Sequence, residues 1–518
     1  MKKLITSNHA VAVGAYHSGV SYVSGYPGTP CTEVLSELRR FKEVECEWST
    51  NEKVALEVAI GTSLAGYRSL VVMKTLGLNV AADAFTQLAG TPLNGGLVLV
   101  VADDIGRIAG DDYQDCRSYG IMAQVPVIEP ANSQEAYDSV SLAFQMSETY
   151  ETPVILRLNG ILCKSKTLVK YATCTWKKHY RRPHEKSLQK TVGNIVKFGF
   201  HNCDNETLKP YWKNFDEEWK AIQEQAETTE FNRETISGSD IGIIASGVAY
   251  EHAREVLPHV SYLKLGLVYP LPRKKIERFV NKHKKVFILE DGHPLIEKEI
   301  KSYQLPVIGV EAFPRFPEML HFTPGVIEEK ILGKMTESRH LEVPLRLPDN
   351  CPGCPHHLVN DVIEKHNIYT SSGIGCGGLG ALPHKGVIDV IKCMGSSIGI
   401  AHGYNKALDK NKQMLSIMGD GEFWHSGINN LINMVLHEST STIVIEDNMT
   451  IAMTGGQATI TPKDGGCGSI EAVCKAIGVE DVQVINPRVE NNLENTIKLA
   501  MDSDQLSVII SRSPCVLF

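Results

Sequence analysis

The chain has 518 residues, which is room for three or four domains of roughly 150 residues each. Hydrophobic residues make up 43% and charged residues 22% of it, as in ordinary globular proteins, which excludes a disordered, collagen-like or coiled-coil chain. Its 52 Lys and Arg residues against 60 Asp and Glu residues give a net charge of −8, which argues against nucleic acid and acidic membranes as partners.

The N-terminal Met1-Lys2-Lys3 is not followed by a signal segment, and no apolar run reaches the length of about 18 residues that crosses a bilayer. The 13 cysteines are scattered along the chain, so a disulfide framework is not expected. These features predict a protein of the reducing cytoplasm that is not embedded in a membrane.

The first 165 residues alternate short β-branched runs with helix-like stretches. Strands are predicted at 69–73, 97–101 and 153–156, with an Ala-rich helix at 53–66. Fully apolar strands separated by helices are typical of a parallel sheet that is covered on both faces. The pattern therefore predicts one α/β domain over 1–165.

Residues 166–237 carry charged, aromatic and amide side chains, including Trp176, Trp212 and Trp219, and no strand run. We interpret them as a partly helical insert or linker. A smaller α/β unit is predicted at 238–345, with strands at 241–245, 261–265 and 285–289. The last unit, 346–518, has four buried parallel strands predicted at 387–392, 414–418, 442–445 and 507–510.

The last unit contains a Gly-Asp-Gly run, Gly419 to Gly421, at the end of one predicted strand, and Asn448 follows the next strand. A helix-like stretch between them makes the two strands parallel, so Asp420 and Asn448 are expected at the carboxyl edge of one sheet, where such sheets bind ligands. The glycines allow an anionic ligand to approach the backbone. A carboxylate, an amide oxygen and a backbone carbonyl suit Mg²⁺. Alone, Gly-Asp-Gly is more often an ordinary turn, but the spacing to Asn448 favours a metal site.

This spacing resembles the thiamine diphosphate-binding fold, in which the metal anchors the diphosphate of the cofactor. The run Met-Thr-Gly-Gly-Gln at 453–457 is similar to the 2-oxoacid:ferredoxin oxidoreductases. Thiamine chemistry also needs a Glu that hydrogen-bonds the aminopyrimidine ring and stabilises the tautomer that removes the thiazolium C2 proton. Glu52 is the candidate, and Glu45, Glu47 and Glu57 compete with it. A Glu at a helix start is otherwise more often a solvated partner of the helix dipole.

Five stretches together resemble the α subunit of indolepyruvate:ferredoxin oxidoreductase. They are 25–30 (Gly-Tyr-Pro-Gly-Thr-Pro), 51–61, 77–83, 351–356 (Cys-Pro-Gly-Cys-Pro-His) and 393–403, in the order of that family. The resemblance implies an α/β fold of two thiamine diphosphate-binding-fold domains, for the pyrimidine (1–165) and the diphosphate (346–518), and a smaller transketolase C-terminal-like domain (238–345). The two binding domains would hold opposite ends of one cofactor.

The resemblance also assigns roles to individual residues. Glu52 would control the cofactor tautomer, and Asp420, Asn448 and the Thr450 carbonyl would bind the metal. Thr29, for which a simple N-cap is an equal alternative, would face the substrate carboxylate. Asn79 and Arg107 are further candidates for substrate binding, although Arg107 stands where the family pattern differs. Eight further residues would cradle the cofactor: Gly28, Cys376, Gly377, Ser396, Gly419, Gly421, Met453 and Thr454.

The chain departs from the family pattern at several places. Family members carry a C-terminal ferredoxin-like segment with clustered cysteines, whereas this sequence stops at Phe518 and contains no such cysteine run, so we expect no iron–sulfur cluster in it. Cys351-Pro-Gly-Cys354 is interpreted as a turn, or alternatively as half of a zinc or cluster site with His356, His357 or Cys376.

Three departures concern the expected pocket. A family Met-His-Ser-Ser run is replaced by Arg107-Ile-Ala-Gly, and an Arg-x-x-x-Arg-x-Ser-His pattern survives only as Arg157. A family Gly-Asp-Ile-Gly-Cys-Tyr-Thr-Leu-Gly run becomes Ser-Gly-Ile-Gly-Cys-Gly-Gly-Leu-Gly at 372–380. Glycines thus replace Asp, Tyr and Thr at 373, 377 and 378, which predicts open space near the cofactor.

Three functions fit the sequence. The first is an oxidoreductase subunit that decarboxylates an aryl or other 2-oxoacid, with coenzyme A as a possible acyl acceptor and electrons passing to a separate γ-type or ferredoxin-like partner. The second is a non-redox decarboxylase or carboligase, with which a glycine-opened pocket is compatible. The third is a catalytically silent structural subunit, against which the retention of Glu52, Asp420 and Asn448 argues. A homodimer is the family expectation.

Overall fold

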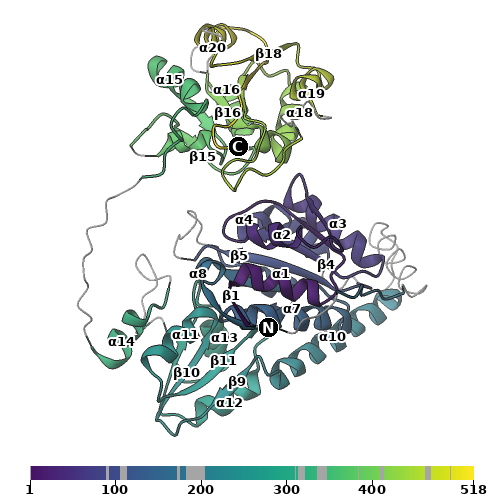
Figure 1. Cartoon of the computed structure of the whole chain (residues 1–518), viewed down its shortest axis with the longest axis vertical. Helices are drawn as coiled ribbons and strands as arrows, with labels where there is room; N and C mark the ends of the chain where they lie inside the picture. Colours follow the sequence, from purple (N-terminus) through teal and green to yellow (C-terminus); the bar gives the residue numbers. More distant parts are fainter. Residues whose placement is uncertain are drawn as a thin grey trace. The chain divides into compact units, whose positions relative to one another are not determined.

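The computed structural model describes most of the chain. The described residues are 2–88, 93–105, 114–171, 176–182, 205–309, 311–312, 321–334, 347–382, 384–408, 413–460, 468–489 and 492–518, with the backbone alone for 205–215. They belong to two compact units, Met1–Arg339 and His340–Phe518 (Figure 1). No helix within these ranges has the length and apolarity to cross a membrane.

The first unit contains a seven-stranded sheet in the order β12-β6-β7-β5-β4-β2-β3. All neighbouring strands are parallel except β12, which pairs antiparallel with β6 at the edge. The predicted strands 69–73, 97–101 and 153–156 are confirmed as its central members. The strand bounds are β2 Tyr22–Gly25, β3 Glu45–Trp48, β4 Ser69–Lys74, β5 Leu97–Asp103, β6 Val127–Ile128, β7 Val154–Asn159 and β12 Leu267–Tyr269.

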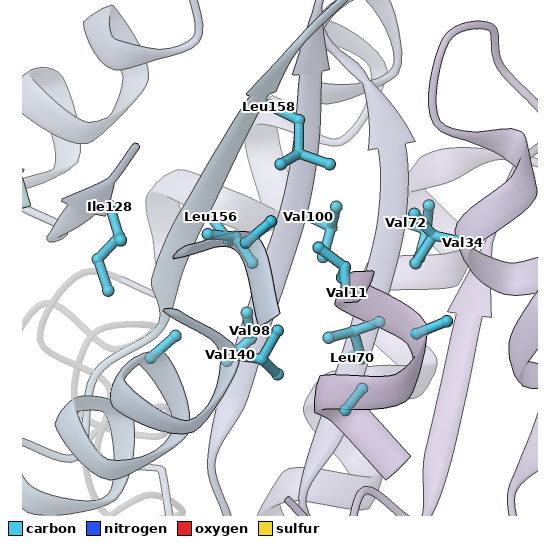
Figure 2. Packing of buried hydrophobic residues seen from close by; sticks show 14 of the residues in the cluster. Val11, Val34, Leu70, Val72, Val98, Val100, Ile128, Val140, Leu156 and Leu158 are labelled. Atoms are coloured by element: carbon cyan, nitrogen blue, oxygen red, sulfur yellow. The ribbon is translucent and has the colours of Figure 1, made fainter. Parts of the chain in front are cut away.

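Helices cover both faces of this sheet, and the predicted Ala-rich helix is α3. Their bounds are α1 Ser7–His17, α2 Thr32–Leu38, α3 Glu52–Leu64, α4 Thr75–Val80, α5 Ala82–Gln87, α6 Arg117–Ala123, α7 Ser133–Thr149 and α8 Gly160–Lys164. Successive strand residues point to opposite faces and so enter two different cores. Figure 2 shows the first core, where α1, α2 and α7 contribute Val11, Val34 and Val140 against Leu70, Val72, Val98, Val100, Leu156 and Leu158.

The second core joins the large sheet to a smaller one. The small sheet has the order β13-β10-β11-β9, and the three strands predicted for it are confirmed. Ile244, Leu263 and Phe279 pack in one cluster with Leu97 and Ile155 of the large sheet. The elements of this part are β9 Arg233–Thr235, β10 Ile241–Ser246, α11 Gly247–Val256, β11 Ser261–Leu265, α12 Arg273–Asn281, β13 Lys285–Leu289, α13 Leu295–Ser302 and α14 Pro324–Leu332.

The segment 166–237 is partly helical, as predicted, but the prediction that it has no strand is wrong. Strand β8 (Lys166–Lys170) pairs antiparallel with β1 (Lys2–Thr6), and only Val169 of it is fully buried, so it does not stand out as an apolar run. Helix α10 (Asn205–Thr228) follows, and Ile222 and Trp219 pack on the first core. Trp176 donates its indole N–H to the Val20 carbonyl at 3.0 Å.

The second unit is built on a six-stranded, fully parallel sheet in the order β15-β14-β16-β17-β19-β18. The predicted strands at 414–418, 442–445 and 507–510 are confirmed, but 387–392 forms only the short β15, because its residues are half-exposed at the sheet edge. The strands are β14 Thr370–Ser372, β15 Val390–Ile391, β16 Leu415–Gly419, β17 Thr442–Asp447, β18 Asp481–Ile485 and β19 Ser507–Arg512.

Helices cover both faces of this sheet as well, around two apolar clusters. Their bounds are α15 His356–His366, a 3₁₀ turn Gly377–Ala381, α16 Ser396–Ala407, α17 Asp420–Glu422, a π-helical turn Phe423–Gly427, α18 Ile428–Leu436, α19 Ile470–Ile477 and α20 Leu493–Met501. The expected α/β class with parallel sheets holds for both units.

Candidate functional site

Asp420 and Asn448 lie side by side at the carboxyl edge of the second unit's sheet, as the sequence predicts. Strands β16 and β17 are parallel neighbours, with Gly419 opposite Glu446, so each polar residue leaves its strand at the same level. Asp420 is 1% and Asn448 6% exposed. Two oxygen-bearing side chains thus share a buried strand edge.

Asp420 has an oxygen with no protein partner. Its Oδ2 is buried and makes no hydrogen bond to any described residue. Burial, followed by the charge of neighbouring Asp447, raises the pKa of Asp420 to about 8. A buried carboxyl with an unpaired oxygen is an incomplete arrangement, and a divalent cation beside it would both satisfy Oδ2 and favour the ionised form.

Asn448 is held by backbone and side-chain contacts. The backbone N–H of Thr450 donates to Asn448 Oδ1 at 3.2 Å, and Asn448 Nδ2 lies 3.3 Å from His356 Nε2. Nδ1 of the same imidazole lies 3.1 Å from Glu446 Oε1. Burial alone would lower the pKa of His356, but the Glu446 carboxylate and the charge of Asp420 together raise that pKa.

The prediction that glycines open space near this edge is wrong. A Cβ built on Gly373, which stands where the family has Asp, would overlap the Glu422 carboxylate, and a Cβ on Gly377, in place of Tyr, would overlap that of Glu446. Glu422 and Glu446 are 3% and 1% exposed. Burial raises the pKa of Glu422 to about 7. Two carboxylates therefore fill the volume that the glycines leave.

The other predicted cradle residues surround the same edge in separate turns. Ser396 begins α16, with its Oγ donating to the Cys393 carbonyl at 2.7 Å. Thr454 donates from Oγ1 to Gln457 Oε1 at 2.6 Å within a turn, and neighbouring Met453 is 48% exposed. Gly421 lies inside α17, directly after Asp420.

The Cys351-Pro-Gly-Cys354 segment forms a turn, as the first interpretation predicts. The Cys354 N–H donates to the Cys351 carbonyl at 2.9 Å, and Gly353 has a φ of 74°. Burial, and then nearby Cys354, Glu446 and Cys515, raise the pKa of Cys376 to about 12. Within the described ranges, no three His, Cys, Asp or Glu side chains are arranged to hold a metal ion.

Glu52 is the buried member of the four candidate glutamates in the first unit. It is 5% exposed and begins α3, whereas Glu45, Glu47 and Glu57 are exposed. The Asn51 side chain caps the helix by accepting from Val54 N at 2.9 Å. Across the carboxyl edge, a Cβ built on Gly77 of α4 would lie 2.5 Å from Glu52 Oε1, so only glycine leaves the carboxylate where it is.

The predicted substrate residues lie in different surroundings. Gly28 and Thr29 follow β2, whose neighbours are the strands before Glu52 and Gly77, so these segments share one sheet edge. Thr29 does not cap α2, because Cys31 occupies the N-cap position. Asn79 is exposed and its amide is bonded to Gln114 and Tyr119. Arg107 lies outside the described residues.

Arg157 is a structural residue. It is fully buried on β7, where its Nε donates to Asp103 at 2.6 Å and its Nη1 to Glu129 at 2.6 Å. Arg117 extends the same ion network through Asp115 and Glu290. The surviving arginine of the family pattern therefore joins the two sheets of the first unit and is not free for a substrate.

Sequence reasoning missed three residues: Gly77, Glu422 and Glu446. For the two glutamates a signal exists, because each stands within two residues of a predicted metal ligand at a point where the glycine-for-Asp and glycine-for-Tyr replacements leave a volume to fill. For Gly77 only its place in the family-like stretch 77–83 distinguishes it.

Comparisons with known proteins agree with this geometry. The model of the pyruvate flavodoxin/ferredoxin oxidoreductase thiamine diphosphate-binding domain matches residues 13–230, and that of the thiamine pyrophosphate enzyme C-terminal binding domain matches 373–511. A 2-oxoglutarate:ferredoxin oxidoreductase from Magnetococcus marinus has a similar fold, with a TM-score of 0.53 and 16% identity over 64% of this chain and 65% of that one.

Sequence relatives are more similar. The indolepyruvate oxidoreductase subunit IorA of Archaeoglobus fulgidus is 33% identical over all of this chain and 87% of its own length. That of Methanothermobacter thermautotrophicus is 32% identical, again over the whole chain and 87% of the relative. The chain therefore belongs to the family of indolepyruvate oxidoreductase IorA subunits, thiamine diphosphate-dependent 2-oxoacid oxidoreductases.

Proposed function

We propose that this protein carries out the Mg²⁺-dependent oxidative decarboxylation of an aryl pyruvate-like 2-oxoacid with thiamine diphosphate. The names of the IorA relatives support the aryl substrate. The Magnetococcus enzyme, which holds 2-oxoglutarate, coenzyme A and succinyl-CoA, supports coenzyme A as the acyl acceptor. Two electrons then leave to a separate iron–sulfur partner.

The observation that carries the proposal is the unpartnered Asp420 Oδ2 beside Asn448 at a buried strand edge. Asp420, Asn448 and the backbone carbonyl of Thr450 are the ligands that we assign to Mg²⁺. All three are oxygen donors from two adjacent strand ends. The cation would anchor the diphosphate, with Gly419, Gly421, Ser396, Cys376, Gly377, Met453 and Thr454 around it.

Glu52 is the residue that we assign to the aminopyrimidine, with Gly28 at the same sheet edge. When bound, thiamine diphosphate supplies a nucleophilic carbon and an electron sink for the loss of CO₂. The Glu52 carboxyl would hold the proton that it exchanges with the aminopyrimidine, and its burial would shield that exchange from water. We assign Thr29, Asn79 and Arg107 to the substrate; of these, Asn79 must exchange its bonds to Gln114 and Tyr119.

We further propose a homodimer in the cytoplasm with a smaller γ-type or ferredoxin-like partner. The alternative of a non-redox decarboxylase or carboligase was compatible with a pocket opened by glycines. Glu422 and Glu446 occupy that volume, so this argument for the alternative no longer applies. A silent structural subunit would have no need of a buried Glu52.

Cofactor binding is tested by titrating the purified chain with thiamine diphosphate, with and without Mg²⁺, using calorimetry. Wild type should bind in a Mg²⁺-dependent manner and Asp420→Ala should not. Asp389→Ala is the matched control, since Asp389 accepts the Thr370 N–H at 2.8 Å on the same sheet but away from Asp420. Unchanged affinity in Asp420→Ala would reject the proposed metal site.

The reaction is tested with a panel of 2-oxoacids, coenzyme A and an artificial one-electron acceptor. We expect CO₂ release with an arylpyruvate only when the acceptor is present. Sustained release of an aldehyde or an acyloin without acceptor would identify the non-redox enzyme. No turnover with any of the 2-oxoacids, even after a γ-type or ferredoxin-like partner is added, would identify the silent subunit.

A further inference from the structure

Three residues from separate segments of the second unit form a buried chain of contacts behind the proposed metal site. Glu446 on β17 lies 3.1 Å from His356 Nδ1 at the start of α15, and His356 Nε2 lies 3.3 Å from Asn448 Nδ2. Their exposed fractions are 1%, 4% and 6%. Water therefore competes little for these contacts.

The backbone determines which way the Asn448 amide points. The Thr450 N–H can only donate, and it lies 3.2 Å from Asn448 Oδ1, so this atom is the carbonyl oxygen. The other amide atom, facing His356, is consequently the NH₂ group. In the neutral imidazole, His356 Nε2 then accepts from this NH₂ group, and the remaining ring proton lies on Nδ1, which faces Glu446 Oε1 at 3.1 Å.

We propose that Glu446 and His356 are positioning residues that keep the Asn448 carbonyl oxygen available to the metal ion. This inference rests on the proposed function, in which Asn448 is a metal ligand. An amide can present either its oxygen or its NH₂ group, and only the oxygen coordinates Mg²⁺. The Thr450 N–H selects the oxygen on one side of the amide, and the imidazole reinforces that orientation by engaging the NH₂ group on the other side.

The fit of Glu446 itself depends on Gly377. A side chain at 377 would collide with the Glu446 carboxylate, so the glycine that replaces the family tyrosine is what leaves room for the chain of contacts. Removing a side chain that hydrogen-bonds a metal ligand commonly lowers the affinity for the metal by about 10- to 100-fold. Breaking this chain should therefore weaken the metal without removing any ligand.

The test uses the full-length chain with thiamine diphosphate and Mn²⁺, a cation with the same preference for oxygen ligands, whose free form is counted by its EPR signal. Glu446→Leu and His356→Ala should raise the Mn²⁺ dissociation constant by about 10- to 100-fold. Glu446→Gln, which keeps an accepting oxygen, should stay near wild type. His402→Ala is the control, because His402 is another buried histidine of this unit, bonded to Ser439 at 3.2 Å.

The outcomes separate this inference from the proposed function. If wild type and Asn448→Ala bind Mn²⁺ equally, the proposed metal site is wrong. If Asn448→Ala loses the metal while Glu446→Leu and His356→Ala retain wild-type affinity, the positioning role is wrong. A Glu446→Gln variant as weak as Glu446→Leu would also overturn it. Circular dichroism checks that each variant folds. If Glu446→Leu does not fold, the positioning role is decided by comparing the Mn²⁺ dissociation constants of His356→Ala and Glu446→Gln.

Discussion

At the scale of single residues, Glu52 depends on a glycine in another helix. Because a Cβ at position 77 would lie 2.5 Å from Glu52 Oε1, Gly77→Ala must push the flexible carboxylate aside. Alanine favours a helix over glycine by about 1 kcal/mol, so the fold itself should not weaken. We expect thermal stability to be kept while exchange of the C2 proton of bound thiamine diphosphate, followed by NMR, slows markedly.

The chain offers a matched control for this change. Gly61 lies in α3, the helix that begins with Glu52, and a Cβ built there meets nothing within 4 Å. Gly61→Ala should raise stability slightly and leave C2 exchange unchanged. Equal exchange rates in the two variants would mean that the position of the Glu52 carboxylate does not matter.

Glu52→Gln tests the proton transfer itself. Gln keeps the size and hydrogen-bonding reach of Glu but cannot exchange a proton, so cofactor affinity should be nearly kept while C2 exchange and turnover fall by about 10²-fold or more. Glu57→Gln, one helical turn further and exposed, should exchange normally. Normal exchange in Glu52→Gln would assign the role to another residue.

At the scale of elements, the 3₁₀ turn at Gly377 and strand β17 are packed against each other through a glycine and a carboxylate. Gly377→Ala should displace Glu446, break its contact with His356, and cost about 1–3 kcal/mol in the free energy of unfolding measured with urea. In a Gly377→Ala/Glu446→Ala double variant the two costs should not add, since the second change removes the atom that clashes. Strict additivity would contradict the contact.

The same pair marks the limit of what the sequence predicts. The central strands, the helix at Glu52 and the meeting of Asp420 with Asn448 follow from apolar runs and chain order alone, because parallel strands bring their carboxyl ends together. That Glu422 and Glu446 fill the places of Gly373 and Gly377 follows less directly. The sequence shows two glutamates beside the predicted metal ligands and two glycines in place of larger residues, but it does not show which of these distant segments meet. Strand β8 was not predicted for a related reason. Its strand partner in the described structure is β1, which is far away in the sequence.

At the scale of the whole molecule, two raised carboxyl pKa values predict how stability depends on pH. Burial raises the pKa of Asp420 from 3.8 to about 8 and that of Glu422 from 4.5 to about 7. Between about pH 4 and pH 8 the folded protein binds more of these protons than the unfolded chain does. The stabilisation that these two protonated carboxyls contribute is thus complete below about pH 4. It is lost as the pH rises through their pKa values in the folded protein, about 7 and about 8.

We therefore expect the metal-free chain to melt at a lower temperature at pH 8 than at pH 6 in the transition of the second unit. Asp420→Asn, which cannot ionise, should flatten this dependence. Mg²⁺ with thiamine diphosphate should stabilise the protein more at pH 8, because the cation binds the ionised carboxylate. A melting temperature that rises from pH 6 to pH 8 in the metal-free protein would contradict the buried, protonated state.

The route of the electrons also concerns the molecule as a whole, and four half-buried cysteines bear on it. They are Cys351, Cys354, Cys376 and Cys515, and burial raises the pKa of Cys354 to about 11 and that of Cys376 to about 12. A thiol must lose its proton to ligate iron, and these values oppose that loss. We therefore expect the chain, purified without oxygen, to contain no stoichiometric iron or acid-labile sulfide and to pass electrons only when a partner is added. Iron and sulfide that disappear in Cys376→Ala, but persist in Cys474→Ala on the far helix α19, would show instead that this chain carries its own electron acceptor beside the cofactor edge.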